Sequence, residues 1–271
     1  GGHVMRAWGA ALLLAVAVQG SAAWAQDARE FCADRPGLDT PPCTMAPGKV
    51  QVELGLGDWT REQDAESRID TVNVGDALLR IGLTDSLEAQ LGWTAFGHVR
   101  TRDRVTGAVE TDSGIGDMRV ALRQNLRNPD GSGFSIAVMP YASLPTGGDA
   151  IGEGDWGAGL LVPISYDLGH GLSLLATPEV DAAVDEDGDG RHLAYGSVAG
   201  LGFDISDSLS GSIEASLMRD DDPDGHATQA LAGLSLGWQA GDDMQFDFGG
   251  NLGLNHDSPD AELYVGVVRR F

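Results

Sequence analysis

The feature that most constrains this chain is an alternation of apolar and polar residues with a period of two. In the run 244–255, one set of alternate positions carries Met, Phe, Phe, Gly, Leu and Leu, whereas the other carries Gln, Asp, Asn and glycine. The runs 134–144 and 209–219 repeat this pattern. Successive side chains of a β-strand point to opposite faces, so each run predicts a strand with one apolar face.

The same period extends from Lys49 to the end of the chain and predicts about twelve strands. Gly75 and Asp76 interrupt the second strand, where the apolar set changes parity, and a glycine at such a point indicates a bulge. The expected strands cover 49–60, 68–83, 87–103, 114–127, 134–145, 155–168, 172–185, 192–206, 209–220, 227–239, 244–255 and 262–271.

Charge and hydropathy exclude two classes of protein. The formal net charge is -24, and a nucleic-acid-binding protein needs clustered cations to contact phosphates. The mean hydropathy of -0.11 excludes a bundle of membrane helices, which needs several apolar runs of about 20 residues. A membrane β-barrel remains open, because its strands divide their apolar residues between alternate positions.

The connections between the expected strands favour such a barrel. Short connections alternate with long acidic ones at 61–67, 104–113, 146–154, 186–191, 221–226 and 256–261. Outer-membrane barrels of the up-and-down type have short periplasmic turns and long external loops. Phe271, an aromatic residue ending an alternating strand, is similar to the C-terminal signal by which bacterial outer-membrane barrels are inserted. We therefore expect an all-β, transmembrane, antiparallel barrel of about 12 strands.

The first 48 residues divide into two expected parts. Residues 1–25 begin with a cloning scar or a misplaced start. They then combine Arg6, a short apolar run and an Ala-x-Ala site, which is typical of a cleaved secretory signal peptide. Residues 26–48 contain Cys32 and Cys43, which we expect to form a disulfide in an oxidising compartment. This segment either plugs the pore or hangs in the periplasm, and residues 49–271 form the barrel.

Five short stretches resemble a known family. They are Cys32–Gly37, Val50–Gly55, Arg80–Glu88, Gly114–Arg119 and Pro140–Gly148. Together they resemble the outer-membrane transporters named for the meta-pathway of phenol degradation. The resemblance implies a barrel in the outer membrane of a Gram-negative bacterium and traffic in small aromatic compounds. No substrate-binding residue of that family can be matched to this chain.

If the apolar parity faces lipid, the other parity lines the lumen. Cations from the early strands would then face carboxylates from the later ones across the pore and set its selectivity. The alternative is that these groups pair across a narrow, plugged lumen, because buried charges need partners. The candidates are Arg80, His98, Arg100, Arg119, Arg123, Asp167, Glu179, Asp181, Asp204, Glu214 and Asp247.

The acidic loops raise the question of metal binding. Asp185, Asp187 and Asp189 occupy alternate positions like the start of an EF-hand loop, but the twelfth position is Gly196 and the flanks are strands. We expect no cofactor beyond adventitious Ca²⁺. Histidines near acidic residues at the outer ends leave a transition-metal site as a further alternative: His192, His226 and His256.

The sequence predicts a passive channel for small molecules, hydrophobic or aromatic ones among them, and not an enzyme. Its expected partners are outer-membrane lipid, lipopolysaccharide, the solute and the barrel-assembly machinery. One alternative is a barrel that does not transport and acts as a structural or cation-binding surface protein. Another is a lipid-modifying enzyme, because His256 and Ser258 superficially resemble a nucleophilic pair, although Pro259 follows them.

Overall fold

The structure, a computed structural model, describes residues 29–271. The predicted signal peptide over 1–25 lies outside the described residues. Among the residues described, no helix has the length and apolar character needed to cross a membrane.

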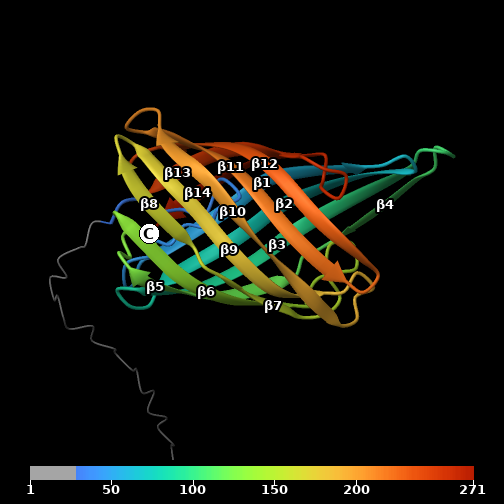
Figure 1. Cartoon of the computed structure of the whole chain (residues 1–271), viewed down its shortest axis with the longest axis horizontal. Helices are drawn as coiled ribbons and strands as arrows, with labels where there is room; N and C mark the ends of the chain where they lie inside the picture. The colour runs from blue at the N-terminus through green and yellow to red at the C-terminus, as the bar shows by residue number, and fades with distance from the viewer. Residues whose placement is uncertain (1–28) are drawn as a thin grey trace, which may run out of the picture.

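Residues 50–270 form fourteen antiparallel strands in one closed sheet (Figure 1). The strands are β1 (Val50–Gln63), β2 (Ser67–Gly82), β3 (Leu87–Asp103), β4 (Val109–Gly114), β5 (Met118–Arg127), β6 (Phe134–Leu144), β7 (Gly157–Leu161), β8 (Ile164–Gly169), β9 (Leu172–Val184), β10 (Arg191–Asp204), β11 (Leu209–Asp222), β12 (Gly225–Gln239), β13 (Met244–Gly253) and β14 (Ala261–Arg270).

The sheet closes because β14 pairs with β1, from Gln51 opposite Arg270 to Arg61 opposite Ala261. Two ring positions are each shared by two consecutive strands. Both β4 and β5 pair with β3, and both β7 and β8 pair with β6 and β9. The barrel therefore has twelve positions around its ring, which confirms the expected antiparallel barrel and its strand count.

The two faces of the wall differ in the way the alternation predicts. Ile213, Leu234 and Phe248 point outward and are exposed, whereas Ser212 and Glu214, the neighbours of Ile213, point inward and are buried. An apolar outer face around a polar interior is the architecture of an outer-membrane barrel. The protein is accordingly a β-barrel of the outer membrane.

The interrupted second strand contains the expected irregularity. Gly75 in β2 has a φ of +72°, a left-handed backbone conformation that residues other than glycine rarely adopt. On its N-terminal side Val72 and Val74 are exposed to the outside, whereas on its C-terminal side Arg80 is buried inside. The conformation at Gly75 thus allows the strand to change the parity of its lipid-facing side.

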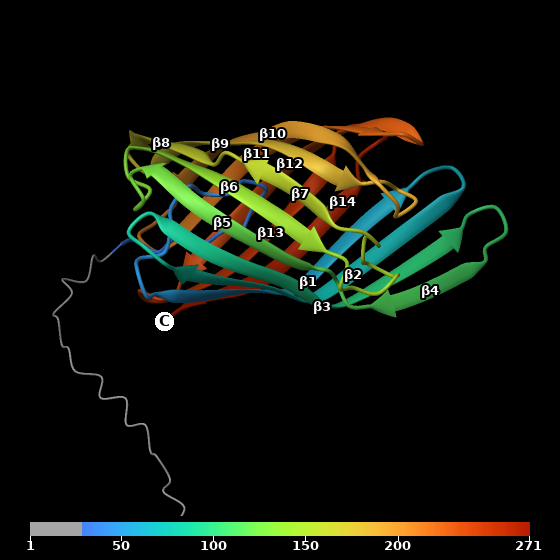
Figure 2. The same ribbon diagram turned by 90° about the horizontal axis from the view of Figure 1, so that it is seen from below.

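One predicted loop is partly wrong. The expected loop over 104–113 continues into β4 at Val109–Gly114, which pairs with β3 and projects past the barrel wall at the end opposite the C-terminus (Figure 2). The sequence of β4, VETDSG, carries no apolar alternation because this strand lies beyond the lipid-facing band. The period of two therefore gave no signal there.

A charge placed on the outward face of the barrel should test whether that face lies in the lipid bilayer. Ile213 is 58% exposed between outward-facing neighbours Leu201 and Leu234, in the central part of β11. We expect Ile213→Arg to lower the free energy of unfolding in lipid vesicles by about 2–4 kcal/mol.

The matched control is Ile205→Arg in a turn at the barrel end, which should cost about 0–1 kcal/mol. Equal costs for both variants, measured by urea titration, would contradict the assignment of the lipid-facing side.

Candidate functional site

The N-terminal segment of the described chain lies inside the barrel. It enters at the end where the chain terminates (Figure 1), and Cys32 and Cys43 form the expected disulfide within it, with their Cα atoms 6.5 Å apart. We call residues 32–45 the plug. Its contacts with the strands are described below.

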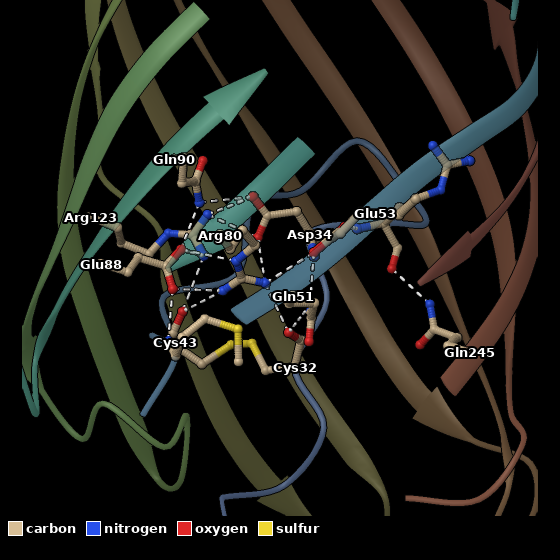
Figure 3. A network of polar contacts seen from close by, with 12 residues as sticks. Cys32, Asp34, Cys43, Gln51, Glu53, Arg80, Glu88, Gln90, Arg123 and Gln245 are labelled. Atoms are coloured by element: carbon tan, nitrogen blue, oxygen red, sulfur yellow. Dashed lines mark hydrogen bonds and ion pairs between the residues drawn. A yellow bond between two sulfur atoms is a disulfide. The ribbon is translucent and has the colours of Figure 1, made fainter. Parts of the chain in front are cut away.

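The plug rests on a buried arginine of the barrel wall (Figure 3). The Arg80 guanidinium on β2 lies 3.1 Å from Glu53 on β1 and 3.0 Å from Glu88 on β3. It also lies 3.2 Å from the Asp34 carboxylate of the plug and donates a 2.8 Å hydrogen bond to the Cys32 carbonyl oxygen. One fully buried cation thus joins three carboxylates and the plug backbone.

A second buried arginine reaches the plug from β5. The Arg123 guanidinium lies 2.7 Å from Asp34 and 3.3 Å from Glu88, and it donates to the Cys43 carbonyl oxygen at 3.1 Å. Burial alone would raise the pKa of Asp34, but the charges of Arg123 and Arg80 outweigh it and lower this pKa to about 2. Asp34 is therefore a carboxylate throughout the physiological pH range.

Strands β11, β13 and β14 also hold the plug. Arg35 of the plug lies 3.0 Å from Asp247 on β13, and the Gly37 amide donates to the Tyr264 hydroxyl on β14 at 3.0 Å. The Leu38 amide donates to the Glu214 carboxylate on β11. The Met45 amide donates to Glu88 on β3, six ring positions from Glu214 on β11, so the plug crosses the lumen.

Asp39 of the plug is placed differently from Asp34. It accepts a 2.7 Å hydrogen bond from the Thr177 hydroxyl on β9, and Glu214 lies nearby. Burial raises its pKa to about 7; the Thr177 bond opposes this shift, and the negative charge of Glu214 adds to it. The Asp39 carboxyl therefore titrates near neutral pH inside the lumen.

The plug separates two cavities. The outer one, which we call the vestibule, has a volume of about 500 Å³ and is lined by Arg119, Tyr141, Asp181 and loop residue Glu153, among others. The inner one has a volume of about 1010 Å³ and is lined by plug residues and by the short turns. In the vestibule the Arg119 guanidinium stacks 3.7 Å from the Tyr141 ring centroid, and the Tyr141 hydroxyl donates to Asp181 at 2.7 Å.

The predicted lumen residues fall into three groups. The plug contacts Arg80, Arg123, Glu214 and Asp247. The vestibule is lined by Arg119 and Asp181, with Glu179 two residues before Asp181 on the same face of β9. Asp204 lines the inner cavity, whereas Asp167 is exposed at the end of β8.

His98 and Arg100 do not join either lumen group. Gly97 on β3 faces the loop residue Ile151, which lines the vestibule, so the adjacent His98 lies on the opposite face. The His98 ring bonds the Ser113 hydroxyl of β4 at 2.7 Å. Arg100 follows on the same side and pairs in register with Thr111 of β4. The change of parity near Gly75 and Ala95, where β2 and β3 lie side by side, accounts for this placement.

Sequence analysis missed the partners of the two central arginines. Glu53, Glu88 and Gln51 are fully or almost fully buried inside the barrel, and Gln51 donates to the Cys32 carbonyl oxygen at 2.9 Å. The signal was present, because Gln51 and Glu53 share the parity opposite to Val50, Val52 and Leu54. The plug residues show no periodic pattern, so the sequence did not indicate their role.

The acidic triplet proposed for Ca²⁺ does not converge. The Asp187 carboxylate accepts a hydrogen bond from the Asp189 amide at 2.9 Å, which is a local turn. Asp185 instead points to His192 at 2.8 Å, and this pair lies with Asp222 of β11 in the one group of potential ligands found among residues 29–271.

The resemblance to a nucleophilic pair is not supported by the geometry at Ser258. The Ser258 hydroxyl hydrogen-bonds Asn255 and the Ala230 carbonyl oxygen, at 2.5 Å and 2.9 Å. The His256 ring faces Asp257 at 3.0 Å and is otherwise open to solvent.

Comparison with known proteins identifies the family. The model of the family described as "Putative MetA-pathway of phenol degradation" matches residues 33–271. The chain belongs to this family. This confirms the resemblance found in the sequence, and it extends the family match across the plug and the whole barrel. No curated protein matches the chain.

Solved structures of similar fold include a channel, a porin and an autotransporter domain. An outer membrane channel from Pseudomonas putida F1 has 16% identity and a TM-score of 0.68, over 89% of this chain and all of that one. The NanC porin has 10% identity and a TM-score of 0.50, over 81% and 98%. The translocator domain of the autotransporter NalP from Neisseria meningitidis has 14% identity and a TM-score of 0.50, over 84% and 90%. At these identities the similarity shows a shared fold.

Removing the central cation should destabilise the protein strongly. Arg80→Met leaves Glu53, Glu88 and Asp34 close together without their shared partner, and breaking a buried ion pair costs about 3–5 kcal/mol. We expect a loss of this size in the free energy of unfolding, measured by urea titration in lipid vesicles.

The control is Arg61→Met, which breaks a partly exposed pair with Asp70 at 2.8 Å. Such pairs contribute about 0–1 kcal/mol. A similar loss in both variants would mean that the cluster around Arg80 does not hold the plug and wall together.

Docking of the plug should depend on pH through Asp39. The docked plug binds the Asp39 proton more tightly than a solvated plug, whose carboxyl has its usual pKa near 3.8. This contribution to docking is therefore complete below about pH 4, declines as the pH rises toward 7, and is absent above it. Hydrogen exchange of the 32–45 amides, corrected for intrinsic rates, should thus be faster at pH 8 than at pH 5.

The variant Asp39→Asn should remove this difference, whereas Asp130→Asn, in a turn at the inner end, should retain it. An unchanged pH response in Asp39→Asn would assign the effect to another group.

Proposed function

We propose that the protein is a passive outer-membrane channel for small molecules, aromatic compounds among them. The observation that carries this proposal is the pair of cavities, about 500 and 1010 Å³, at the two ends of one polar lumen. A solute would enter the vestibule, pass the plug level and reach the inner cavity. The family description, which refers to phenol degradation, supports an aromatic solute.

Passage requires the plug to shift. Ion pairs and hydrogen bonds hold the plug to the wall, such as those of Arg80, Asp247 and Tyr264, and among residues 29–271 its one covalent link to a strand is the short stretch 46–49 that leads into β1. The Cys32–Cys43 disulfide closes the plug on itself. The plug can therefore change its position as a compact unit while the barrel wall stays intact.

The vestibule favours cations and neutral solutes over anions. Asp76, Asp117, Glu153, Asp181 and Asp220 line it, against two arginines. A cavity lined by one sign of charge concentrates solutes of the opposite sign. A phenolic hydroxyl, with a pKa of about 10, is neutral at physiological pH, so it enters this field without repulsion.

Two further partners belong to this proposal. The acidic external loops, such as the one containing Asp187 and Asp189, would contact lipopolysaccharide through bridging divalent cations. The barrel-assembly machinery would recognise the last strand with Phe271, whose amide donates to the Val50 carbonyl oxygen at 2.8 Å.

A barrel without transport is the second candidate, because the plug crosses the lumen from β3 to β11. Flux through proteoliposomes distinguishes the two. Tyramine and 4-hydroxyphenylacetate are suitable solutes, since both carry a phenol ring and they differ in the sign of their charge.

If the protein is a channel, we expect tyramine flux above that of protein-free vesicles. We also expect it to be faster than the flux of 4-hydroxyphenylacetate. Neutralising Asp117 and Glu153 together, as Asn and Gln, should bring the two rates closer. Flux of neither solute above the protein-free background would support the non-transporting barrel.

A further inference from the structure

A histidine and three carboxylates meet at the external end of the barrel, outside the plug and its contacts. His192, at the start of β10, is only 6% exposed in its side chain. Its Nδ1 lies 2.8 Å from Asp185 and 3.4 Å from Asp222, and its Nε2 lies 2.5 Å from Asp220. The carboxylates come from the loop after β9 and from the end of β11, so two separate hairpins contribute to the group.

The geometry points to a divalent transition-metal site, for which Zn²⁺ is the simplest probe. We propose that Nδ1 of His192 and one carboxylate oxygen each from Asp185 and Asp222 bind the ion. These three atoms lie within 4.8 Å of one another. A mixed imidazole and carboxylate set suits Zn²⁺ and neighbouring ions, whereas Ca²⁺ takes oxygen ligands.

Asp220 is placed to orient the His192 ring rather than to bind the ion. A histidine that binds a metal through one ring nitrogen almost always donates the other N–H to a carboxylate or carbonyl, which fixes its tautomer. The Nε2 atom of His192 is buried and lacks a partner with good hydrogen-bond angles, yet it faces Asp220. A small movement of Asp220 gives this bond, and Nδ1 is then free for the ion.

The two ligand carboxylates are held by the surrounding backbone. Both oxygens of Asp222 accept 2.8 Å hydrogen bonds, from the amides of Glu186 and Asp224. A Cβ at Gly190 would lie 2.6 Å from an Asp185 oxygen, so only glycine leaves room for that carboxylate. These contacts orient the carboxylates toward His192 before any ion binds.

The arginines next in sequence do not supply the missing positive charge. Arg191 pairs with Asp155 at 2.8 Å and stacks on Trp156. Arg219 pairs with Asp221 at 2.8 Å. Three carboxylates therefore share one imidazole, and a divalent ion would offset the excess negative charge. Because Asp220 also lines the vestibule, the ion would sit beside the entrance to the lumen and join two external loops.

The test is equilibrium dialysis of the folded, chelator-treated protein in detergent against Zn²⁺, followed by metal analysis. We expect one Zn²⁺ per chain, with binding weakened about 10–100-fold in Asp220→Asn and more strongly in His192→Ala and Asp222→Asn. The control is His226→Ala, which alters a 65% exposed histidine on the neighbouring strand and should bind as the unaltered protein does.

Heat-modifiable migration in gels shows which variants fold, and either His192→Ala or Asp222→Asn suffices for the conclusion. No Zn²⁺ bound by the unaltered protein, equal binding by both ligand variants, or displacement of Zn²⁺ by equimolar Ca²⁺ would each overturn the proposal. The outcome does not depend on solute flux, so it is independent of the proposed channel function.

Discussion

Two arginines buried inside a barrel must find negative partners, and the arrangement of the lumen follows from that requirement. An isolated charge removed from water costs several kcal/mol, which only close ion pairs and hydrogen bonds offset. Glu53 and Glu88 supply part of the compensation from the wall, and Asp34 of the plug contacts both Arg80 and Arg123. The plug is thus part of the charge balance of the barrel interior and not an appendage to it.

The distribution of charge differs between the level of the plug and the vestibule. With the plug docked, polar groups on distant strands are bridged through residues 34–40, as in the chain from Arg123 on β5 through Asp34 and Arg35 to Asp247 on β13. The vestibule beyond this level has five carboxylates in its lining against two arginines. Structure and electrostatics therefore divide the lumen into a neutralised middle and an acidic entrance.

Sequence reasoning recovered the wall of this protein better than its interior. Alternation predicted twelve ring positions and the parity change at Gly75, because lipid contact demands an apolar face along the whole membrane-spanning part. It missed β4, which lies outside that part. It also placed Arg80 and Arg123 in the lumen. It could not pair them with Asp34, because the plug lacks the alternating pattern that would predict its path.

The cluster of His192 with Asp185 and Asp222 could not be predicted from the sequence either. Asp185 and His192 are neighbours in one hairpin, but Asp222 reaches them from another hairpin, after 30 residues of chain. Such a meeting depends on how the hairpins lie side by side in the closed ring. Periodicity within one strand contains no information about it.

The seam between β1 and β14 has a consequence for how the plug docks. It joins the first strand to the last, so the ring is closed only when both ends of the sheet are paired. The plug precedes β1 in the chain and makes contacts on both sides of the seam, with Glu53 on β1 and with Tyr264 on β14. These contacts exist together only when the first and last strands are paired, so docking of the plug and closure of the seam are coupled.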